Sequence, residues 1–224
     1  FIGNRMLQPY FREAQLCLIE GSTPEKIDSV MENFGMAMGP IAVSDLAGID
    51  IGYKARETLT DEEKGPAKTF CVSDALVEMD RLGQKSGAGF YTYDPQTRKR
   101  MNDAKVMDIV HKQAKAQGIE RREIGEEELL NRMTFGLINE GAKVLEEGIA
   151  QRPSDIDVVY IYGYGYPVSR GGPMHYADTI GLKTIYDTIC QYAKDFGDDF
   201  WKPSALLKQL AEEGKTFAQW AQEH

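Results

Sequence analysis

Residues 4–21 read NRMLQPYFREAQLCLIEG, and this stretch decides the fold because its pattern returns later in the chain. Its apolar side chains recur at the i, i+3, i+4, i+7 spacing of a helix with one buried face. Gly21 follows them as a residue that commonly ends a helix. The stretch therefore predicts a helix over residues 4–20.

The same pattern appears again in residues 131–148, NRMTFGLINEGAKVLEEG, so that Asn4 and Asn131 lie 127 residues apart. Further matches keep the same order, and their spacing rises to 129 and then 133 residues, as two small insertions would produce. They pair Pro24 with Pro153, Ile27-Asp28 with Ile156-Asp157, Gly39-Pro40 with Gly172-Pro173, Asp45 with Asp178, Gly48 with Gly181 and Tyr53 with Tyr186. An ordered series through three helices indicates duplication of one helical unit. We therefore predict an all-α fold of two tandem, similar domains.

Local signals place the other helices of the first copy. Thr23-Pro24-Glu25 is typical of a helix start and predicts a second helix that reaches Phe34. Pro40 is expected to begin a third helix, whose apolar stripe continues through Ile49 toward Tyr53. Residues 60–66 are polar enough to form a surface loop.

Residues 83–100 mark the end of the first copy. The glycines of residues 83–89 give way to alternating aromatic residues, which is typical of a tight turn followed by a short extended piece. Residues 94–100, DPQTRKR, are predicted to be a charged connector. We place the domain boundary there, which gives a first helical domain over residues 1–100 and a second, repeat-related domain over residues 101–224.

The composition argues against several classes of protein. Lys and Arg number 26 against 35 Asp and Glu, and the formal charge of −9 makes nucleic acid an unfavourable partner. No apolar run reaches the roughly 18–20 residues that span a bilayer, and no secretory leader is visible. Three scattered cysteines give no disulfide framework. The first residue is Phe1 rather than Met, which indicates a piece of a longer protein.

No residue pattern by itself describes a complete active site. The glycine clusters at residues 87–89 and 163–165 fail the G-x-G-x-x-G pattern of a dinucleotide site, and no P-loop can be read. His111, His175 and His224 have no partners at metal-ligand spacing, and we interpret His175 as a packing residue rather than a general base. Tyrosines at alternate positions could in principle form a cofactor cage, but such a pattern is more typical of a core or an interface. They are Tyr160, Tyr162, Tyr164 and Tyr166.

Several motifs of the chain occur in the order found in one enzyme family. They are FIGNRML at residues 1–7, FGMAMGP at 34–40 with DLAG at 45–48, and KSGAGFY at 85–91. On these residues the chain resembles the C-terminal part of L-3-hydroxyacyl-CoA dehydrogenases, which implies the 6-phosphogluconate dehydrogenase C-terminal-like helical fold. The second copy, with RPSDID at 152–157, YGYGYP at 162–167 and RGGPM at 170–174, is similar to the final domain of multifunctional fatty acid β-oxidation enzymes of the peroxisomal bifunctional type. Such enzymes carry an enoyl-CoA hydratase region, a Rossmann domain and two tandem helical domains.

The resemblance implies a reaction in which the C3 hydroxyl of an L-3-hydroxyacyl-CoA loses its proton to a histidine and its hydride to NAD. That histidine, its glutamate partner and a serine belong to the Rossmann domain, so NAD is expected to be bound by a domain absent from this chain. The catalytic asparagine of the family matches Asn4, whose carboxamide would position a substrate oxygen. A helix N-cap is the other interpretation of Asn4. Met38, Pro40 and Leu46 match the wall of the acyl pocket, with ordinary core packing as the alternative.

The resemblance also implies partners and a location. We expect an acyl-CoA substrate, upstream Rossmann and hydratase domains in the same chain, and a pseudo-dimer in which the second copy replaces a partner subunit. Asn131 would then be structural, because it faces no second Rossmann domain. The chain alone is expected to be inactive, and its compartment to be the peroxisome, with the bacterial cytoplasm or the mitochondrial matrix as alternatives. The competing hypothesis is a stand-alone helical interaction or dimerisation module without activity.

Overall fold

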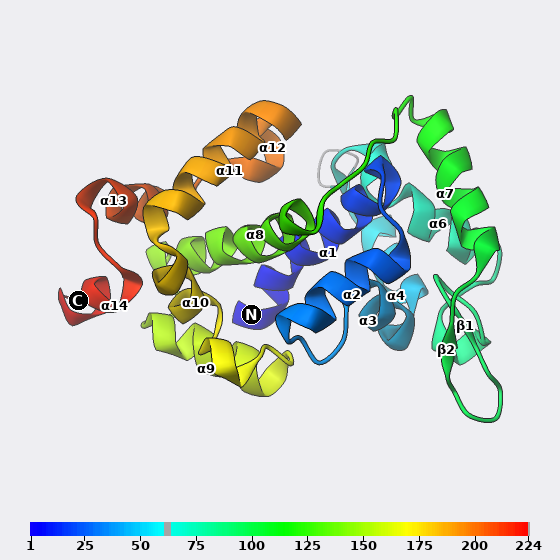
Figure 1. The fold of residues 1–224 in the computed structure, drawn as a ribbon, viewed down its shortest axis with the longest axis horizontal. Helices are drawn as coiled ribbons and strands as arrows, with labels where there is room; N and C mark the ends of the chain where they lie inside the picture. Colours follow the sequence, from blue (N-terminus) through cyan, green and yellow to red (C-terminus); the bar gives the residue numbers. More distant parts are fainter. Residues whose placement is uncertain (61–63, 224) are drawn as a thin grey trace. The chain divides into compact units, whose positions relative to one another are not determined.

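Helices make up nearly all of the regular structure in the computed structural model, which describes residues 1–60 and 64–223. In chain order the elements are α1 (Ile2–Glu20), α2 (Pro24–Phe34), α3 (Pro40–Ala47), α4 (Ile49–Glu57), the 3-10 helix η1 (Ala67–Thr69), α6 (Cys71–Glu78), η2 (Gln84–Ser86), β1 (Thr92–Tyr93), β2 (Arg100–Met101), α7 (Ala104–Ala116), α8 (Glu126–Glu146), α9 (Pro153–Gly163), η3 (Val168–Arg170), α10 (Pro173–Ile180), α11 (Leu182–Phe196), α12 (Asp198–Trp201), α13 (Ala205–Glu213) and α14 (Phe217–Glu223) (Figure 1). The all-α prediction is confirmed. The sequence repeat pairs α1 with α8, α2 with α9, α3 with α10 and α4 with α11.

The first two helices begin and end close to the predicted residues. α1 ends at Glu20, directly before Gly21. α2 begins at Pro24, and the Thr23 hydroxyl accepts a hydrogen bond of 3.2 Å from the Lys26 N–H, as an N-cap residue does. Both helices are thus confirmed. The loop predicted at residues 60–66 includes residues 61–63, which lie outside the described part of the chain.

The predicted third helix is wrong in its length, because Gly48 divides it. α3 ends at Ala47 and α4 begins at Ile49, with Gly48 between them at φ +99°, a conformation that residues with side chains rarely adopt. Gly181 has φ +98° between α10 and α11 of the second copy. The matched glycines therefore give both copies the same break between two helices.

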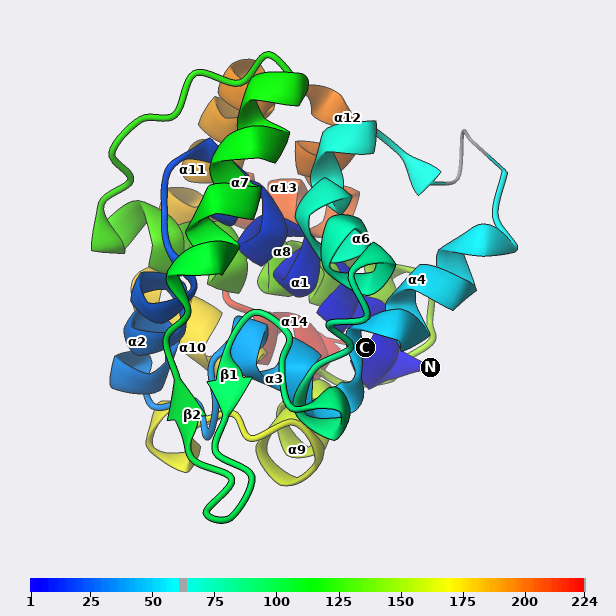
Figure 2. The ribbon, with the colours of Figure 1, turned by 90° about the vertical axis from the view of Figure 1, so that its right-hand side faces the viewer.

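A short hairpin follows the glycine-rich segment. β1 and β2 pair antiparallel, with Thr92 opposite Met101 and Tyr93 opposite Arg100 (Figure 2). The predicted extended piece is thereby confirmed. Residues 94–100, which we predicted to connect two domains, form the loop between the strands and the first residue of β2.

The chain groups into two compact units, each with its own internal packing. The first unit comprises residues 1–10, 34–37 and 130–224, and α10 packs in it against α9, α11 and α14. The second unit comprises residues 11–33 and 38–129, and α6 packs in it against α4 and α7. The division into domains 1–100 and 101–224 stays a prediction. None of the helices formed by the described residues has both the length and the apolar character that a membrane crossing requires.

One aspartate in each copy holds the start of the helix that follows it. The Asp28 carboxylate on α2 accepts hydrogen bonds from the backbone N–H groups of Ile41 and Ala42, at 2.8 and 3.0 Å, in the first turn of α3. Asp157, its match on α9, accepts from the corresponding first-turn N–H groups of α10 at 2.7 and 3.2 Å. These donors have no partner inside their own helix, so a carboxylate is favourable there. The duplication has therefore kept the same contact between helices in both copies.

Both of these aspartates are expected to make stability depend on pH. Burial raises the pKa of Asp28 and of Asp157 from 3.8 to about 6, although hydrogen bonds oppose the shift, from the Tyr91 hydroxyl and backbone N–H groups at Asp28 and from backbone N–H groups at Asp157. A carboxyl group whose pKa is higher in the folded than in the unfolded state stabilises the fold when it is protonated. This contribution to the unfolding free energy is complete below about pH 4 and is lost as the pH rises through 6. The unfolding free energy of the parent minus that of Asp28→Asn should therefore fall between pH 4 and 6, by up to about 1.4 kcal/mol per pH unit. Urea unfolding across this window measures the difference.

Asp157→Asn provides the matched comparison and should show the same downward trend over the same window, because burial raises both pKa values to about 6. A difference between parent and variant that stays constant with pH would contradict the raised pKa.

Candidate functional site

Asn4 lies in the first turn of α1 with an exposed side chain. Because α1 begins at Ile2, Asn4 already lies inside the helix, and the N-cap interpretation is wrong. Its Oδ1 accepts a hydrogen bond of 2.7 Å from the Tyr164 hydroxyl. That bond uses only the carbonyl side of the carboxamide, so it leaves the two N–H groups of Nδ2 for a ligand.

Arg5, the next residue of the NRM motif, is bound by two glutamates of α8. The terminal guanidinium nitrogens bind Glu147, and Nε donates to Glu140 at 2.7 Å. These two carboxylates raise the pKa of Arg5 above its ordinary value and balance its charge. Arg5 therefore anchors the start of α1 to α8, a role that the sequence did not reveal.

Asn131 has different surroundings from its match Asn4. α8 begins at Glu126, so Asn131 lies in the second turn of its helix, where its side chain is half-buried. Relative to its match α1, α8 has one more turn before the asparagine. This turn begins with the acidic residues 126–128, which are favourable at the positive end of a helix dipole. Two asparagines with the same local sequence are therefore presented differently.

The candidate acyl-pocket residues lie in and just before α3. Pro40 is buried as the first residue of α3, and Met38 is half-buried in the turn that precedes it. Leu46 is 56% exposed, so its side chain is accessible to a ligand or to another domain. These three residues belong to the second compact unit and Asn4 to the first. Their role in substrate binding stays a prediction.

The KSGAGFY motif surrounds a buried aspartate, Asp45. The carboxylate accepts hydrogen bonds from the backbone N–H groups of Phe90 and Tyr91, at 2.9 and 3.0 Å, and from the Tyr93 hydroxyl at 2.9 Å. Gly89 permits this approach, because a Cβ there would lie 2.1 Å from Asp45 Oδ1. The motif thus fixes the chain around Asp45, and Gly89 serves that contact.

The two described histidines, His111 and His175, lie on exposed helix surfaces. The prediction that His175 is a packing residue is wrong, because its side chain is exposed on α10 while its backbone N–H donates to Asp157. His111 is exposed on α7, and His224 lies outside the described residues. Over residues 1–60 and 64–223, His, Cys, Asp and Glu side chains form no group of three that could hold a metal ion.

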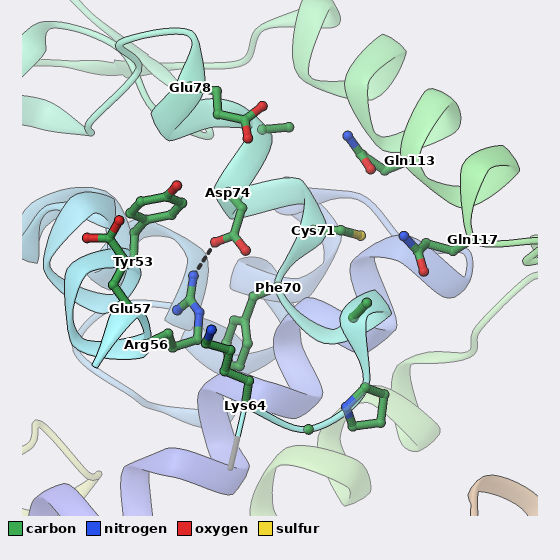
Figure 3. A pocket seen from close by; sticks show the side chains of 14 residues that line it. Tyr53, Arg56, Glu57, Lys64, Phe70, Cys71, Asp74, Glu78, Gln113 and Gln117 are labelled. Carbon is green, nitrogen blue, oxygen red and sulfur yellow. Dashed lines mark hydrogen bonds and ion pairs between the residues drawn. The ribbon is translucent and has the colours of Figure 1, made fainter. Parts of the chain in front are cut away.

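A pocket of about 550 Å³ lies in the second unit, where α4, α6 and α7 supply most of its lining. Figure 3 shows Arg56 of α4 reaching Asp74 of α6 in an ion pair, and the Arg56 guanidinium lies 4.3 Å from the centre of the Phe70 ring. Burial raises the pKa of the Cys71 thiol to about 11, so this thiol stays protonated at neutral pH and is a poor nucleophile. Arg56 is therefore paired within the pocket lining, and the Cys71 thiol is not activated as a nucleophile.

Comparisons with known proteins agree with the duplicated pattern. The family model of the 3-hydroxyacyl-CoA dehydrogenase C-terminal domain matches two stretches of the chain, residues 1–93 and residues 129–221. The peroxisomal bifunctional enzyme of Homo sapiens is 44% identical over 96% of this chain and 31% of its own length. The fatty acid oxidation complex subunit alpha of Ectopseudomonas oleovorans is 36% identical over 97% of this chain and 30% of its own length.

One solved structure is similar over almost the whole chain. It is the dehydrogenase part of multifunctional enzyme 1 from C. elegans, with a TM-score of 0.74 and 30% sequence identity. The similarity covers 93% of this chain and 47% of that chain. The chain therefore spans less than half of that structure and about a third of the curated relatives that it matches.

Proposed function

The chain belongs to the family of 3-hydroxyacyl-CoA dehydrogenase C-terminal domains, and on that basis we propose that it is the C-terminal part of a multifunctional enzyme of fatty acid β-oxidation. In that enzyme the chain completes an NAD-dependent L-3-hydroxyacyl-CoA dehydrogenase. The Rossmann domain of the dehydrogenase and an enoyl-CoA hydratase region both precede it in the same polypeptide. Asn4 carries the proposal, because the FIGNRML motif presents an exposed carboxamide whose carbonyl oxygen is already bound by Tyr164.

The proposed reaction oxidises the C3 hydroxyl of an L-3-hydroxyacyl-CoA to a ketone. NAD, bound by the preceding domain, would accept the hydride, and the histidine of that domain would take the hydroxyl proton. Asn4 donates a hydrogen bond from Nδ2 to a substrate oxygen and holds that oxygen in place during the transfer. A fixed donor of this kind accelerates a reaction by orienting the reactants and by stabilising charge that develops on oxygen.

The glycine-rich segments of this chain lack the G-x-G-x-x-G pattern of an NAD site, and one glycine of each lies in a contact within the chain. The Asp45 carboxylate packs against Gly89, so close that a Cβ there would clash with it. A Cβ on Gly165 would lie 2.9 Å from the Cβ of Ala37, so that glycine also serves a contact within the chain. We therefore assign NAD binding to the preceding domain.

The second copy is proposed to take the place of a partner subunit, which makes the two copies a pseudo-dimer. Both copies match the same family model. Asp157 holds the start of α10 as Asp28 holds the start of α3, and Gly181 interrupts the helices as Gly48 does. These shared contacts support two copies of one fold, of which the first carries the asparagine that we assign to catalysis.

The proposed function is tested by comparing this 224-residue chain with a chain that also carries the preceding domain. We expect the short chain neither to bind NAD with micromolar affinity nor to oxidise 3-hydroxybutyryl-CoA, and the longer chain to do both. Calorimetric titration with NAD and the absorbance of NADH provide the two measurements. Activity in the short chain would overturn the assignment of the missing groups to another domain. An inactive longer chain would favour the helical interaction module instead.

We place the full-length protein in the peroxisome, because relatives named as peroxisomal bifunctional enzymes are 38–44% identical to this chain. The bacterial cytoplasm is one alternative location, since bacterial relatives are 36–37% identical to this chain. The mitochondrial matrix is a second alternative. Fluorescence microscopy of the tagged full-length chain distinguishes these compartments.

A further inference from the structure

We propose that Tyr164 is a positioning residue for Asn4, and that its hydroxyl turns the Asn4 carboxamide so that Nδ2 faces the substrate oxygen. This inference rests on the proposed catalytic role of Asn4. It assigns to the second copy of the repeat a direct part in the chemistry of the first, in addition to its role in the pseudo-dimer.

In the structure the contact holds one orientation of the carboxamide. The Tyr164 hydroxyl donates a hydrogen bond of 2.7 Å to Oδ1 of Asn4. An exposed asparagine can otherwise rotate about its last bond and present either its oxygen or its nitrogen to a ligand. With the oxygen held by Tyr164, the two N–H groups are the ones presented, and a substrate oxygen requires a donor.

Tyr164 is itself held against the start of α1. Its ring stacks on the Tyr160 ring with centres 5.0 Å apart and an interplanar angle of 24°. The Tyr160 hydroxyl donates to the backbone carbonyl of Gly3 at 2.9 Å. A Cβ on Gly3 would lie 2.1 Å from the Tyr164 ring, so only glycine allows the ring to lie so close to this turn. The residue before Asn4 and the ring behind Tyr164 therefore place the two side chains together.

The backbone around Tyr164 is fixed on both sides. Its N–H donates to the Tyr160 carbonyl at 3.1 Å, which closes the end of α9. Gly165 follows at φ +68°, and its carbonyl accepts a hydrogen bond of 3.0 Å from the Ala37 N–H. A hydroxyl carried on such a segment keeps its position, and a fixed donor orients Asn4 better than water does.

The contact is suited to orientation more than to stability. Asn4 is exposed and Tyr164 is half-buried, so water can replace either partner when the other is removed. The loss of the hydroxyl should therefore leave the fold intact and act on the reaction through Asn4.

The test uses the chain that also carries the preceding domain. Tyr164→Phe keeps the stacked ring and removes only the hydroxyl, and we expect kcat to fall about 5–10-fold while KM for the acyl-CoA substrate changes by less than about 2-fold. Thermal unfolding should be unchanged. The control is Tyr162→Phe, which removes a hydroxyl from an 86% exposed tyrosine of α9 and should leave kcat as it is.

A double-mutant cycle with Asn4→Ala separates the possible outcomes. If Tyr164 acts through Asn4, Tyr164→Phe has no further effect once Asn4 is alanine. Full activity in Tyr164→Phe, or two losses that simply multiply, would overturn the positioning role while leaving Asn4 catalytic. An Asn4→Ala variant with the parent kcat would instead refute the proposed function itself.

Discussion

Asn4→Ala is expected to lower kcat about 100-fold in the chain that also carries the preceding domain, as the loss of a preorganised hydrogen-bond donor does. Asn4→Asp should be at least as damaging. Its carboxylate can still accept the Tyr164 hydroxyl, which now binds Oδ1 at 2.7 Å, but it has no N–H to offer a substrate oxygen. Steady-state rates with an L-3-hydroxyacyl-CoA and NAD measure both variants.

Asn131→Ala is the matched control, since Asn131 has the same Asn-Arg-Met context in the second copy. Its side chain is half-buried in the second turn of α8 and lies farther from the start of its helix than Asn4 does. We expect kcat to stay within about 2-fold of the parent value. Equal losses in the two alanine variants would contradict the division of roles between the copies, and an unaffected Asn4→Ala would contradict the catalytic assignment.

The repeat made much of the helical fold predictable. Matched pairs at spacings of 127 to 133 residues identified duplicated helices, and Asp28 with Asp157 was already one of these pairs. What each aspartate does could not be predicted, because its N–H donors lie 13 to 18 residues away and come close only after two helices have packed. The helix break at Gly48 was missed for a related reason. A positive φ leaves no trace in the spacing of apolar residues.

The surroundings of the candidate site were less predictable than its motif. The tyrosines at alternate positions suggested a core or an interface, but Tyr160 and Tyr166 are buried while Tyr162 is exposed. Tyr164 is the one whose hydroxyl has a hydrogen bond to Asn4 in the described structure, across 160 residues of sequence. Local patterns carry no information on such a contact. Gly3 was the available signal, since a glycine inside a helix often marks close approach of another group.

Asp45→Ala is expected to be strongly destabilising, with a loss on the order of 4 kcal/mol in the unfolding free energy. Asp45 is buried and accepts two backbone N–H groups and the Tyr93 hydroxyl, so alanine leaves three donors without their acceptor. The burial that raises the pKa of Asp45 also excludes the water that could replace its carboxylate. Urea unfolding followed by circular dichroism measures the loss, and amide hydrogen exchange at Phe90 and Tyr91 locates it.

Asp178, the match of Asp45 in the second copy, provides the comparison. It accepts the N–H groups of Phe217 and Ala218, at 2.8 and 3.0 Å, at the start of α14, but it is only half-buried. Water can reach these donors after Asp178→Ala, so we expect a loss of about 1 kcal/mol. Asp45→Asn keeps one acceptor oxygen, so its loss in unfolding free energy should lie between those of the two alanine variants. This variant allows the comparison to be made even if Asp45→Ala does not fold. Equal losses at Asp45 and Asp178 would show that burial does not determine the strength of this duplicated contact.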